Sequence, residues 1–453
     1  GLFNLLDFGL TPTISRQTTQ YNAGVETALG FRQLFRALSI IFSLIALIGG
    51  GILFYFNEYI ASNWLKLEKL NILDVLFCLK IMAICVALRW ITGLYRGVIT
   101  GFERIVWLSL VNIVIATLRF PGVLLYMYFF GFSIRNFFIF QIIVAFIEFL
   151  FLAVYAFILL PKLEKSEKIG WSFKPIKPLL GFALTITITS SVWVLLTQLD
   201  KFVLSGILPL SEYGYFTLAV LVAGGILQIS VPISSAIMPR MARLQGEKKY
   251  QEVRDVYLGA TQFVAVIVVT AGIVLAFLAK PVLYVWTGDV ILANKAAPIL
   301  QLYSLGNAIL ALGAFPYYLQ YAKGSLKYHF IGNLGSAILL IPAIIWAAEN
   351  YGALGAGWVW LLIQSIYLIF WVSYVHIKLE PDLNVRWYAS FLPSSLGVLC
   401  FIFLISYFII FSEQRFIAFL QISLISLISL IIAIIFSDKA RSIIKSKFLK
   451  SKV

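Results

Sequence analysis

Charged residues are scarce in this sequence. Asp, Glu, Lys and Arg make up 12% of its 453 residues, against roughly 25% in an average soluble domain. Hydrophobic residues make up 61%. So few charges could not cover the surface of a water-soluble protein of this length, and this composition excludes a soluble fold.

Histidine and cysteine are also rare, with two and three residues respectively. Cys78, Cys85 and Cys400 fall inside apolar stretches, where cysteine acts as a small packing residue. His329 and His376 fall at the edges of such stretches, and neither belongs to a cluster with the spacing of metal ligands. We therefore expect no metal, no cofactor and no catalytic residue.

Long hydrophobic runs are abundant instead. A helix of about 20 apolar residues crosses the hydrocarbon core of a bilayer, and we mark twelve such stretches. They lie at 36–56, 73–93, 105–130, 136–160, 178–205, 213–237, 258–280, 296–320, 328–348, 353–376, 390–411 and 416–437. Residues 1–14 look like the second half of another span, so we expect that a first helix is missing. The sequence predicts an all-α polytopic membrane protein.

Lysine and arginine are unevenly divided between the loops. Most of the 35 basic residues fall in every second loop, beginning with the loop after residue 14. Because basic residues in short loops favour the cytoplasmic side, we predict that these loops are cytoplasmic. The net charge of +15 is then mainly a topology signal and predicts no nucleic-acid partner, although the basic tail could contact anionic lipid.

Two parts of the sequence repeat one pattern. After a span, each part has a glycine, an arginine eight positions later and an aromatic residue eleven positions later. The matched residues are Gly24, Arg32 and Phe35 in one part, and Gly246, Arg254 and Tyr257 in the other. An asparagine followed nine positions later by a proline also recurs, at Asn112 and Asn333. With one helix missing, both matches are six spans apart.

A repeat of six spans predicts two parallel lobes, because an even number of spans returns the chain to the same side of the membrane. Two helices at the C-terminal end remain outside the repeat. The predicted parts are an N-terminal lobe at 1–160, a cytoplasmic linker at 161–177, a C-terminal lobe at 178–376, two extra helices at 390–437 and a basic cytoplasmic tail at 438–453. Parallel repeats are typical of transporters that work by alternating access.

Five segments carry a resemblance to a known family. They are "LLDFGLTPTISRQ", "LYRGVITGFERIVWLSLVNIVIATLRF", "TQLDKFVLSGILPLSEYGYFTLA", "AIMPRMARL" and "PYYLQYAKGSLKYHFIGNLGSAILLIPAIIW". In this order they resemble bacterial polysaccharide-export flippases, the O-antigen (Wzx-type) branch of the MATE-like (MOP) superfamily. The resemblance covers residues 1–437.

This resemblance implies a bundle of twelve or fourteen helices in the bacterial inner membrane. Such a protein is a transporter and not an enzyme. It moves undecaprenyl-pyrophosphate-linked oligosaccharide units from the cytoplasmic to the periplasmic leaflet, with a polysaccharide polymerase as a potential partner. Transport would be driven by protons, by sodium or by consumption of the product.

Two cations inside the spans are the first candidates for binding the pyrophosphate. At 1.5 Å per residue, Lys80 and Arg119 lie at similar depths on successive helices, so they could clamp one anion. Charges inside spans usually face a cavity or a partner. Two alternatives stay open: Lys80 could extend its side chain outward to the interface, and Arg119 could bind carbonyls that are freed by a kink at Pro121.

Three further arginines are second candidates for the anion, namely Arg16, Arg89 and Arg96. Arg89 follows Lys80 by nine residues, so it points to the opposite face of a straight helix. It shares a face with Arg96, where both could meet lipid phosphates or the substrate from the cytoplasm.

Asp200 and Lys201 are adjacent charges within an apolar run. Adjacent helical residues point about 100° apart, so we expect each to need a different partner and both to line the interface between the lobes. The alternative is an interfacial pair that only fixes the depth of the helix. Glu148, near the middle of its span, and Asp7 are candidates for coupling to an ion.

Two other functions stay open. A MATE-type drug exporter shares the expected fold, but it would need acidic groups in the first lobe to hold cationic drugs, where this sequence has Lys80 and Arg119. A membrane glycosyltransferase or O-antigen ligase would need a large outer loop with catalytic acids, and the longest outer loop predicted here is only 57–72.

Overall fold

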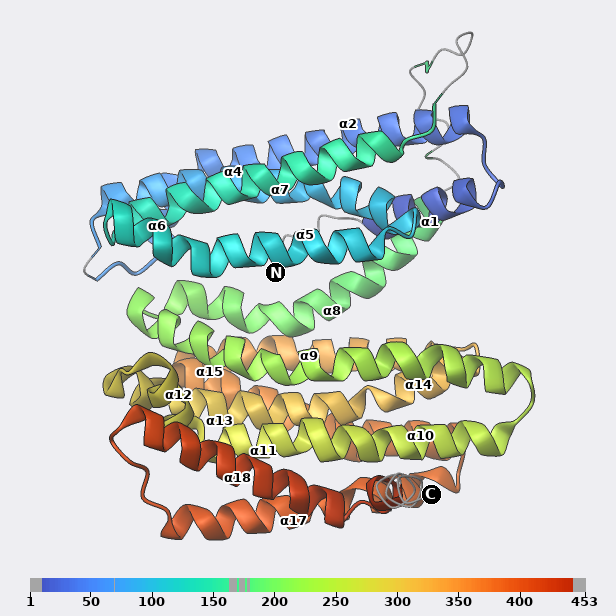
Figure 1. Cartoon of the computed structure of the whole chain (residues 1–453), viewed down its shortest axis with the longest axis vertical. Helices are drawn as coiled ribbons and strands as arrows, with labels where there is room; N and C mark the ends of the chain where they lie inside the picture. The colour runs from blue at the N-terminus through green and yellow to red at the C-terminus, as the bar shows by residue number, and fades with distance from the viewer. Residues whose placement is uncertain (1–9, 69, 163–168, 171–175, 177–179, 443–453) are drawn as a thin grey trace, which may run out of the picture. The chain divides into compact units, whose positions relative to one another are not determined.

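The computed structural model describes the chain except for residues 1–9, 69, 163–168, 171–175, 177–179 and 443–453, and in the described part it is built of helices (Figure 1). Among these residues, nine helices are long and apolar enough to cross a membrane. One of them, Lys327–Leu379, contains two predicted spans, because the backbone of Gly352 is not helical. The helices Ile72–Gly101 and Leu180–Ile207 match the remaining two, so each of the twelve expected stretches coincides with a helix.

The chain forms two compact units, Gly1–Gln198 and Leu199–Val453. The division falls inside helix α8 (Leu180–Ile207), which crosses from one unit to the other. The predicted lobe boundaries around 161–177 are close to this division and remain a prediction. Each unit is described separately below.

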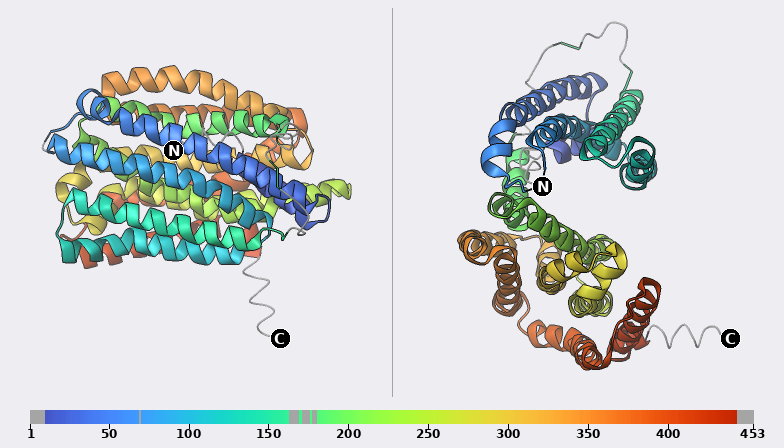
Figure 2. Two further views of the ribbon diagram at one scale, coloured as in Figure 1. Left: turned by 90° about the horizontal axis from the view of Figure 1, so that it is seen from above. Right: turned by 90° about the vertical axis from the view of Figure 1, so that its left-hand side faces the viewer.

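Unit 1 is a bundle of long helices around α4. Its elements are α1 (Leu10–Asn22), α2 (Ala28–Tyr55), α3 (Asn57–Tyr59), α4 (Ile72–Gly101), α5 (Ile105–Thr117), α6 (Val123–Phe130) and α7 (Ile134–Leu159). Helix α4 packs against α1, α2 and α7, and the blue to blue-green helices of this unit run side by side (Figures 1 and 2). A π-helical turn, Leu118–Gly122, joins α5 to α6 around Pro121.

Three glycines let α1 approach α4 closely. Gly93, Gly97 and Gly101 are spaced four residues apart and therefore lie on one face of α4. A Cβ atom on Gly97 would stand 2.4 Å from Cγ2 of Ile14, and one on Gly101 would stand 2.5 Å from the carbonyl oxygen of Ser15. Small residues at such spacing are how membrane helices pack without a hydrophobic driving force. The contact fixes the rotation of α4, and hence the direction of its arginines.

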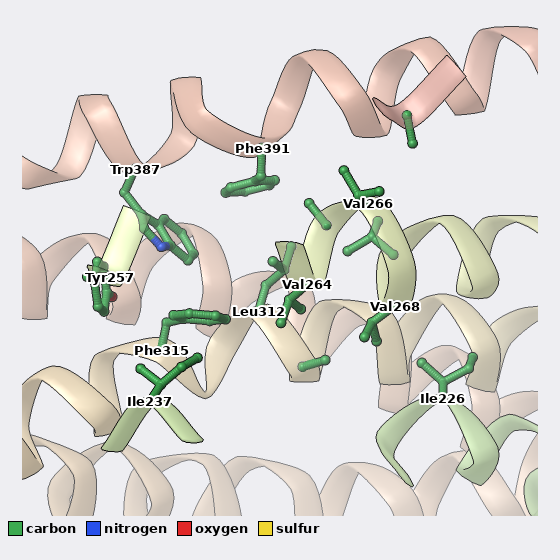
Figure 3. Close-up of a cluster of buried hydrophobic side chains, with 14 of the residues drawn as sticks. Ile226, Ile237, Tyr257, Val264, Val266, Val268, Leu312, Phe315, Trp387 and Phe391 are labelled. Carbon is green, nitrogen blue, oxygen red and sulfur yellow. The ribbon is translucent and has the colours of Figure 1, made fainter. Parts of the chain in front are cut away.

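Unit 2 holds the remaining helices. They are α9 (Leu210–Gly246), α10 (Tyr250–Val264), α11 (Thr270–Phe277), α12 (Ala279–Thr287), α13 (Val290–Gly313), α14 (Phe315–Ala322), α15 (Lys327–Ile366), α16 (Ser373–Leu379), α17 (Leu383–Phe408) and α18 (Arg415–Ile435). Its core includes Tyr257, Phe315 and Trp387, which are fully buried (Figure 3). The indole N–H of Trp387 donates to Oγ1 of Thr261 at 2.9 Å. Helix α17, expected to be an appendix, is therefore joined to the unit's core.

The contacts of two arginines support the internal repeat. Arg32 lies four positions after the first residue of α2, and Arg254 lies four positions after the first residue of α10. Nε of Arg32 donates to the carbonyl oxygen of Pro161 at 2.8 Å, and Nε of Arg254 donates to Oε2 of Glu380 at 2.6 Å. Pro161 follows the end of α7 and Glu380 follows α16, so each arginine binds the end of the last predicted span of its half.

Candidate functional site

A buried carboxylate in unit 1 pairs with two arginines. The side chain of Glu148, on α7, is only 7% exposed. Its Oε1 lies 2.5 Å from Nη2 of Arg96, and its Oε2 lies 2.6 Å from Nη2 of Arg119. One carboxylate thus orients two guanidinium groups from different helices.

A third arginine completes the cluster. Arg89 precedes Arg96 by two helical turns on α4, and it interacts electrostatically with Arg119 and Glu148. The spacing of seven residues predicts that Arg89 and Arg96 share one face of α4. We call Arg89, Arg96, Arg119 and Glu148 the arginine cluster. It combines three positive charges with one negative charge, so two positive charges remain in excess.

The position of Arg119 comes from the π-helical turn. π-Helical turns appear often at functional sites, and this one contains Pro121. The side chain of Gln141 donates to the backbone carbonyl of Arg119 at 3.2 Å. The guanidinium itself turns to Glu148 and not to the carbonyls freed by the proline. Its Nε is buried and, among the described residues, has no hydrogen-bond partner.

Two polar side chains, one from α5 and one from α7, hold the cluster in place. Nη1 of Arg96 donates to Oδ1 of Asn112, on α5, at 2.8 Å, and Gln141 comes from α7. Sequence reasoning singled out Asn112 only as a marker of the repeat and missed Gln141. A polar amide inside an apolar span was the available signal for both.

Lys80 lies outside the cluster. It is exposed, and its Nζ lies 5.8 Å from the centre of the Phe54 ring. Equal depth placed Lys80 together with Arg119 in the predicted clamp, whereas the structure groups Arg119 with Arg89 and Arg96. The reason is rotational, because residues nine apart on α4 face opposite ways. That Lys80 and Arg119 share one anion stays a prediction.

The two remaining candidates of unit 1 stay predictions. Arg16 is exposed on α1, and Asp7 lies outside the described residues. In the part of the chain that is described, no three His, Cys, Asp or Glu side chains are grouped so that they could hold a metal ion.

Asp200 is buried in unit 2, with partners from its own unit. The hydroxyl of Tyr303, on α13, donates to Oδ2 of Asp200 at 2.6 Å. The backbone N–H of Lys201 donates to Oδ1 at 2.8 Å, and Nζ of Lys201 lies 3.5 Å from the same oxygen. The expectation that the adjacent charges do not pair is wrong, because the flexible lysine stem folds back over the angle between them. A position at the lobe interface stays a prediction.

A network missed by sequence reasoning continues from Tyr303. Its ring stacks with Trp360 at 6.1 Å between ring centres. The indole N–H of Trp360 donates to Oδ1 of Asn307 at 3.1 Å, and the amide of Asn307 donates to the carbonyl of Ala223 at 2.9 Å. The network fixes Tyr303, and with it the carboxylate of Asp200, between α8, α9, α13 and α15.

Solved structures of membrane transporters have a similar fold. A lipid II flippase, MurJ, in an inward closed conformation is similar with a TM-score of 0.67 at 16% identity, over 95% of this chain and 91% of that chain. An inward-facing multidrug resistance MATE family transporter of the MOP superfamily is similar with a TM-score of 0.62 at 13% identity, over 85% and 89%. The protein is thus a multi-pass membrane protein with the fold of MOP-superfamily transporters.

The sequence matches agree with this class. Residues 2–245 match the family model of the polysaccharide biosynthesis proteins. A Shigella flexneri protein to which O-antigen transport is ascribed is 22% identical over 377 residues, which is 81% of this chain and 87% of that protein. The chain belongs to the polysaccharide biosynthesis protein family.

Proposed function

We propose that this protein is a flippase for undecaprenyl-pyrophosphate-linked oligosaccharides. It takes them from the cytoplasmic to the periplasmic leaflet by alternating access of its two halves. The observation that carries the proposal is the arginine cluster, because it holds excess positive charge on residues of apolar spans. The family supports the substrate class, and the O-antigen transport ascribed to the Shigella flexneri relative agrees with it.

The chemistry of the cluster fits a pyrophosphate. Arginine recognises phosphate oxygens through two parallel N–H donors, and three guanidinium groups could meet both phosphates of the substrate. The buried Nε of Arg119 is a donor still available for such an oxygen. A charge inside a membrane costs several kcal/mol unless it has a partner, so an anion that satisfies the two excess charges would be bound strongly.

In this proposal the carboxylate of Glu148 pairs with the arginines when no anionic substrate is bound. Without an anion, its carboxylate keeps Arg96 and Arg119 oriented and reduces their mutual repulsion. When a pyrophosphate takes over these two guanidinium groups, Glu148 loses its partners. It could then accept a proton or a sodium ion, which is how the coupling role of Glu148 would arise. Asp7 remains a second candidate for this role.

A MATE-type drug exporter is less consistent with the same site. Cationic drugs would be repelled by a cluster with two positive charges in excess. Structural similarity to a MATE transporter at 13% identity shows the fold alone. We propose the bacterial inner membrane as the location, where a polysaccharide polymerase would use the product.

The test is genetic complementation followed by direct binding. The full-length gene should restore surface polysaccharide to a flippase-null strain, and Arg96→Ala should abolish this at a normal protein level. The matched control is Arg135→Ala, because Arg135 pairs with Asp74 at an exposed position. Purified protein should bind undecaprenyl-pyrophosphate glycan, and Arg96→Ala should bind it weakly. Equal binding by both proteins would overturn the proposal.

A further inference from the structure

A second candidate site lies in unit 2, away from the arginine cluster. It is a groove between α9 and α10 that Lys439, just after α18, borders on a third side, and it encloses about 700 Å³. This volume is within the roughly 300–1,000 Å³ of pockets that bind small molecules. No residue of this groove takes part in the function proposed above.

The lining of the groove changes character along its length. Helix α9 runs toward the turn at Gly246, and α10 runs back from Tyr250. Arg240 is close to the end of α9, while Glu252 and Asp255 are close to the start of α10, so these three charges lie at the turn. The turn is predicted to be cytoplasmic, and the charges therefore lie at the height of lipid headgroups.

The opposite end of the groove is apolar. Ile233 and Ile237 follow from α9, and Val256 and Phe263 from α10. The spacing of four residues on α9 and of seven on α10 places each pair on one face of its helix. Phe263 is 48% exposed even though it lies within a span. A charged mouth with an apolar floor is the shape that a lipid requires.

Lys439 is held against the groove by specific contacts. Its backbone N–H donates to Oε1 of Gln262 at 2.9 Å, and the hydroxyl of Ser437 donates to the same oxygen at 3.2 Å. Its aliphatic stem crosses Gly259, where a Cβ atom would stand 3.3 Å from Cε of the lysine. The glycine makes room for the stem, and Gln262 fixes the chain, so Lys439 adds a second cation to the lining of the groove.

The charges that line the groove do not neutralise one another. Two cations, Arg240 and Lys439, and two carboxylates, Glu252 and Asp255, line the same groove. Within the described residues, no ion pair joins either cation to either carboxylate. Other charges at this end of the unit do pair, since Glu247 lies 2.9 Å from Lys249 and 3.7 Å from Arg243. An occupant with one negative and one positive group would complement all four.

We propose that the groove binds phosphatidylethanolamine, a phospholipid that carries a phosphate and a primary ammonium. The phosphate would meet Arg240 and Lys439, and the ammonium, with three N–H donors, would meet Glu252 and Asp255. One acyl chain would lie along the apolar floor. An anionic lipid would leave the carboxylates without a cation, and a choline headgroup has no N–H to donate.

Native mass spectrometry of the purified full-length protein tests the proposal. In equal mixtures of phosphatidylethanolamine, phosphatidylglycerol and phosphatidylcholine, the protein should retain the first preferentially. Glu252→Gln with Asp255→Asn should reduce this preference by up to about fivefold for each carboxylate removed, since an exposed charge pair contributes up to about 1 kcal/mol. The control Glu212→Gln with Glu349→Gln removes the same charge outside the groove and should have no effect.

A second pair of variants tests the location. Ala236→Leu fills the groove and should lower lipid retention, whereas Ala116→Leu, also at an exposed alanine, should not. Equal retention of the three lipids, or an unchanged preference in the carboxylate variant, would refute the proposal. So would displacement of the lipid by undecaprenyl phosphate at equal concentration, because the groove would then belong to the transported lipid. Each result is independent of whether the protein is a flippase.

Discussion

The carboxylate of Glu148 accepts hydrogen bonds from Arg119 at 2.6 Å and Arg96 at 2.5 Å, and this joins α4, the π-helical turn and α7 within unit 1. Removing one member of such a buried ion pair costs stability, because the charges that remain lose their partner. It is also a natural site for exchange, since an anionic ligand offers the arginines the same contacts.

The first prediction concerns this carboxylate. Glu148→Gln should lower the free energy of unfolding by roughly 3–5 kcal/mol, because two guanidinium groups lose their charged partner. Undecaprenyl pyrophosphate should stabilise the variant more than the wild type, since it supplies the missing negative charge. Thermal unfolding in detergent with and without this lipid measures both effects. Asp74→Asn, which removes an exposed partner of Arg135, is the control and should respond to the lipid as the wild type does.

Exchange of cations should distinguish Arg119 from Lys80. Arg119→Lys should impair export more than Lys80→Arg, because arginine offers two parallel hydrogen bonds and lysine a point charge. Either alanine variant should be worse than its conservative counterpart. The effects of Arg96→Ala and Arg119→Ala should be non-additive, as for groups that share a partner. The measurement is surface polysaccharide at matched protein level. Fully additive effects would mean that the two arginines do not act on a shared partner.

Asp200 gives a third prediction. Asp200→Asn should leave the protein level normal, because the amide oxygen can still accept the hydrogen bond of Tyr303. It should reduce export, because the variant lacks the negative charge that pairs with Lys201. Tyr303→Phe should instead lower stability by about 1–3 kcal/mol, since the buried carboxylate loses a donor. Unchanged export in Asp200→Asn would mean that the Asp200–Lys201 pair only fixes the depth of α8.

The glycine contact between α1 and α4 can be tested with matched alanines. Gly97→Ala should destabilise the protein by about 1–3 kcal/mol, as overpacking does, because the new Cβ would stand 2.4 Å from Ile14. Gly51→Ala is the control: nothing lies within 4 Å of its Cβ position, so the higher helix propensity of alanine should stabilise by up to ~1 kcal/mol. Melting temperatures in one detergent compare the two, and equal shifts would contradict the packing argument.

The last prediction concerns pH. Burial raises the pKa of Glu380, but hydrogen bonds and charges from Lys323 and Arg254 outweigh burial and hold that pKa below its ordinary value. A lowered pKa stabilises the folded state above the unfolded value of about 4.3, and the contribution is lost as pH falls through the folded-state pKa.

Glu380→Gln should therefore lower stability at pH 7 by roughly 1.5–3 kcal/mol, the usual contribution of a hydrogen bond to a charged group. The difference from wild type should shrink as pH falls below about 4. Unfolding at pH 7 and at acidic pH measures it. Asp382→Asn, two residues further along the chain, is the control, and a difference that persists at acidic pH would exclude the ionised carboxylate as its source.

The membrane-spanning architecture was readable from the sequence, because the bilayer imposes its requirement locally. Each span must supply about 20 apolar residues whatever its neighbours are, so the twelve stretches could be marked one by one. The repeat was readable for a similar reason: Arg32 and Arg254 occupy equivalent positions along the chain. Depth was readable too, since it follows from residue number along a helix.

The partners of the buried charges were decided only by the tertiary structure. The depth of a residue in the membrane does not fix the direction in which its side chain points. Depth alone suggested Lys80 as the neighbour of Arg119, but Arg119 lies with Glu148, Arg96 and Arg89. That direction depends on how α4 is rotated, which the close approach of α1 at Gly97 sets. Likewise, Asp200 lies against Tyr303, more than one hundred residues away in sequence. A partner at such a distance is chosen by helix packing, and no local pattern around either residue encodes it.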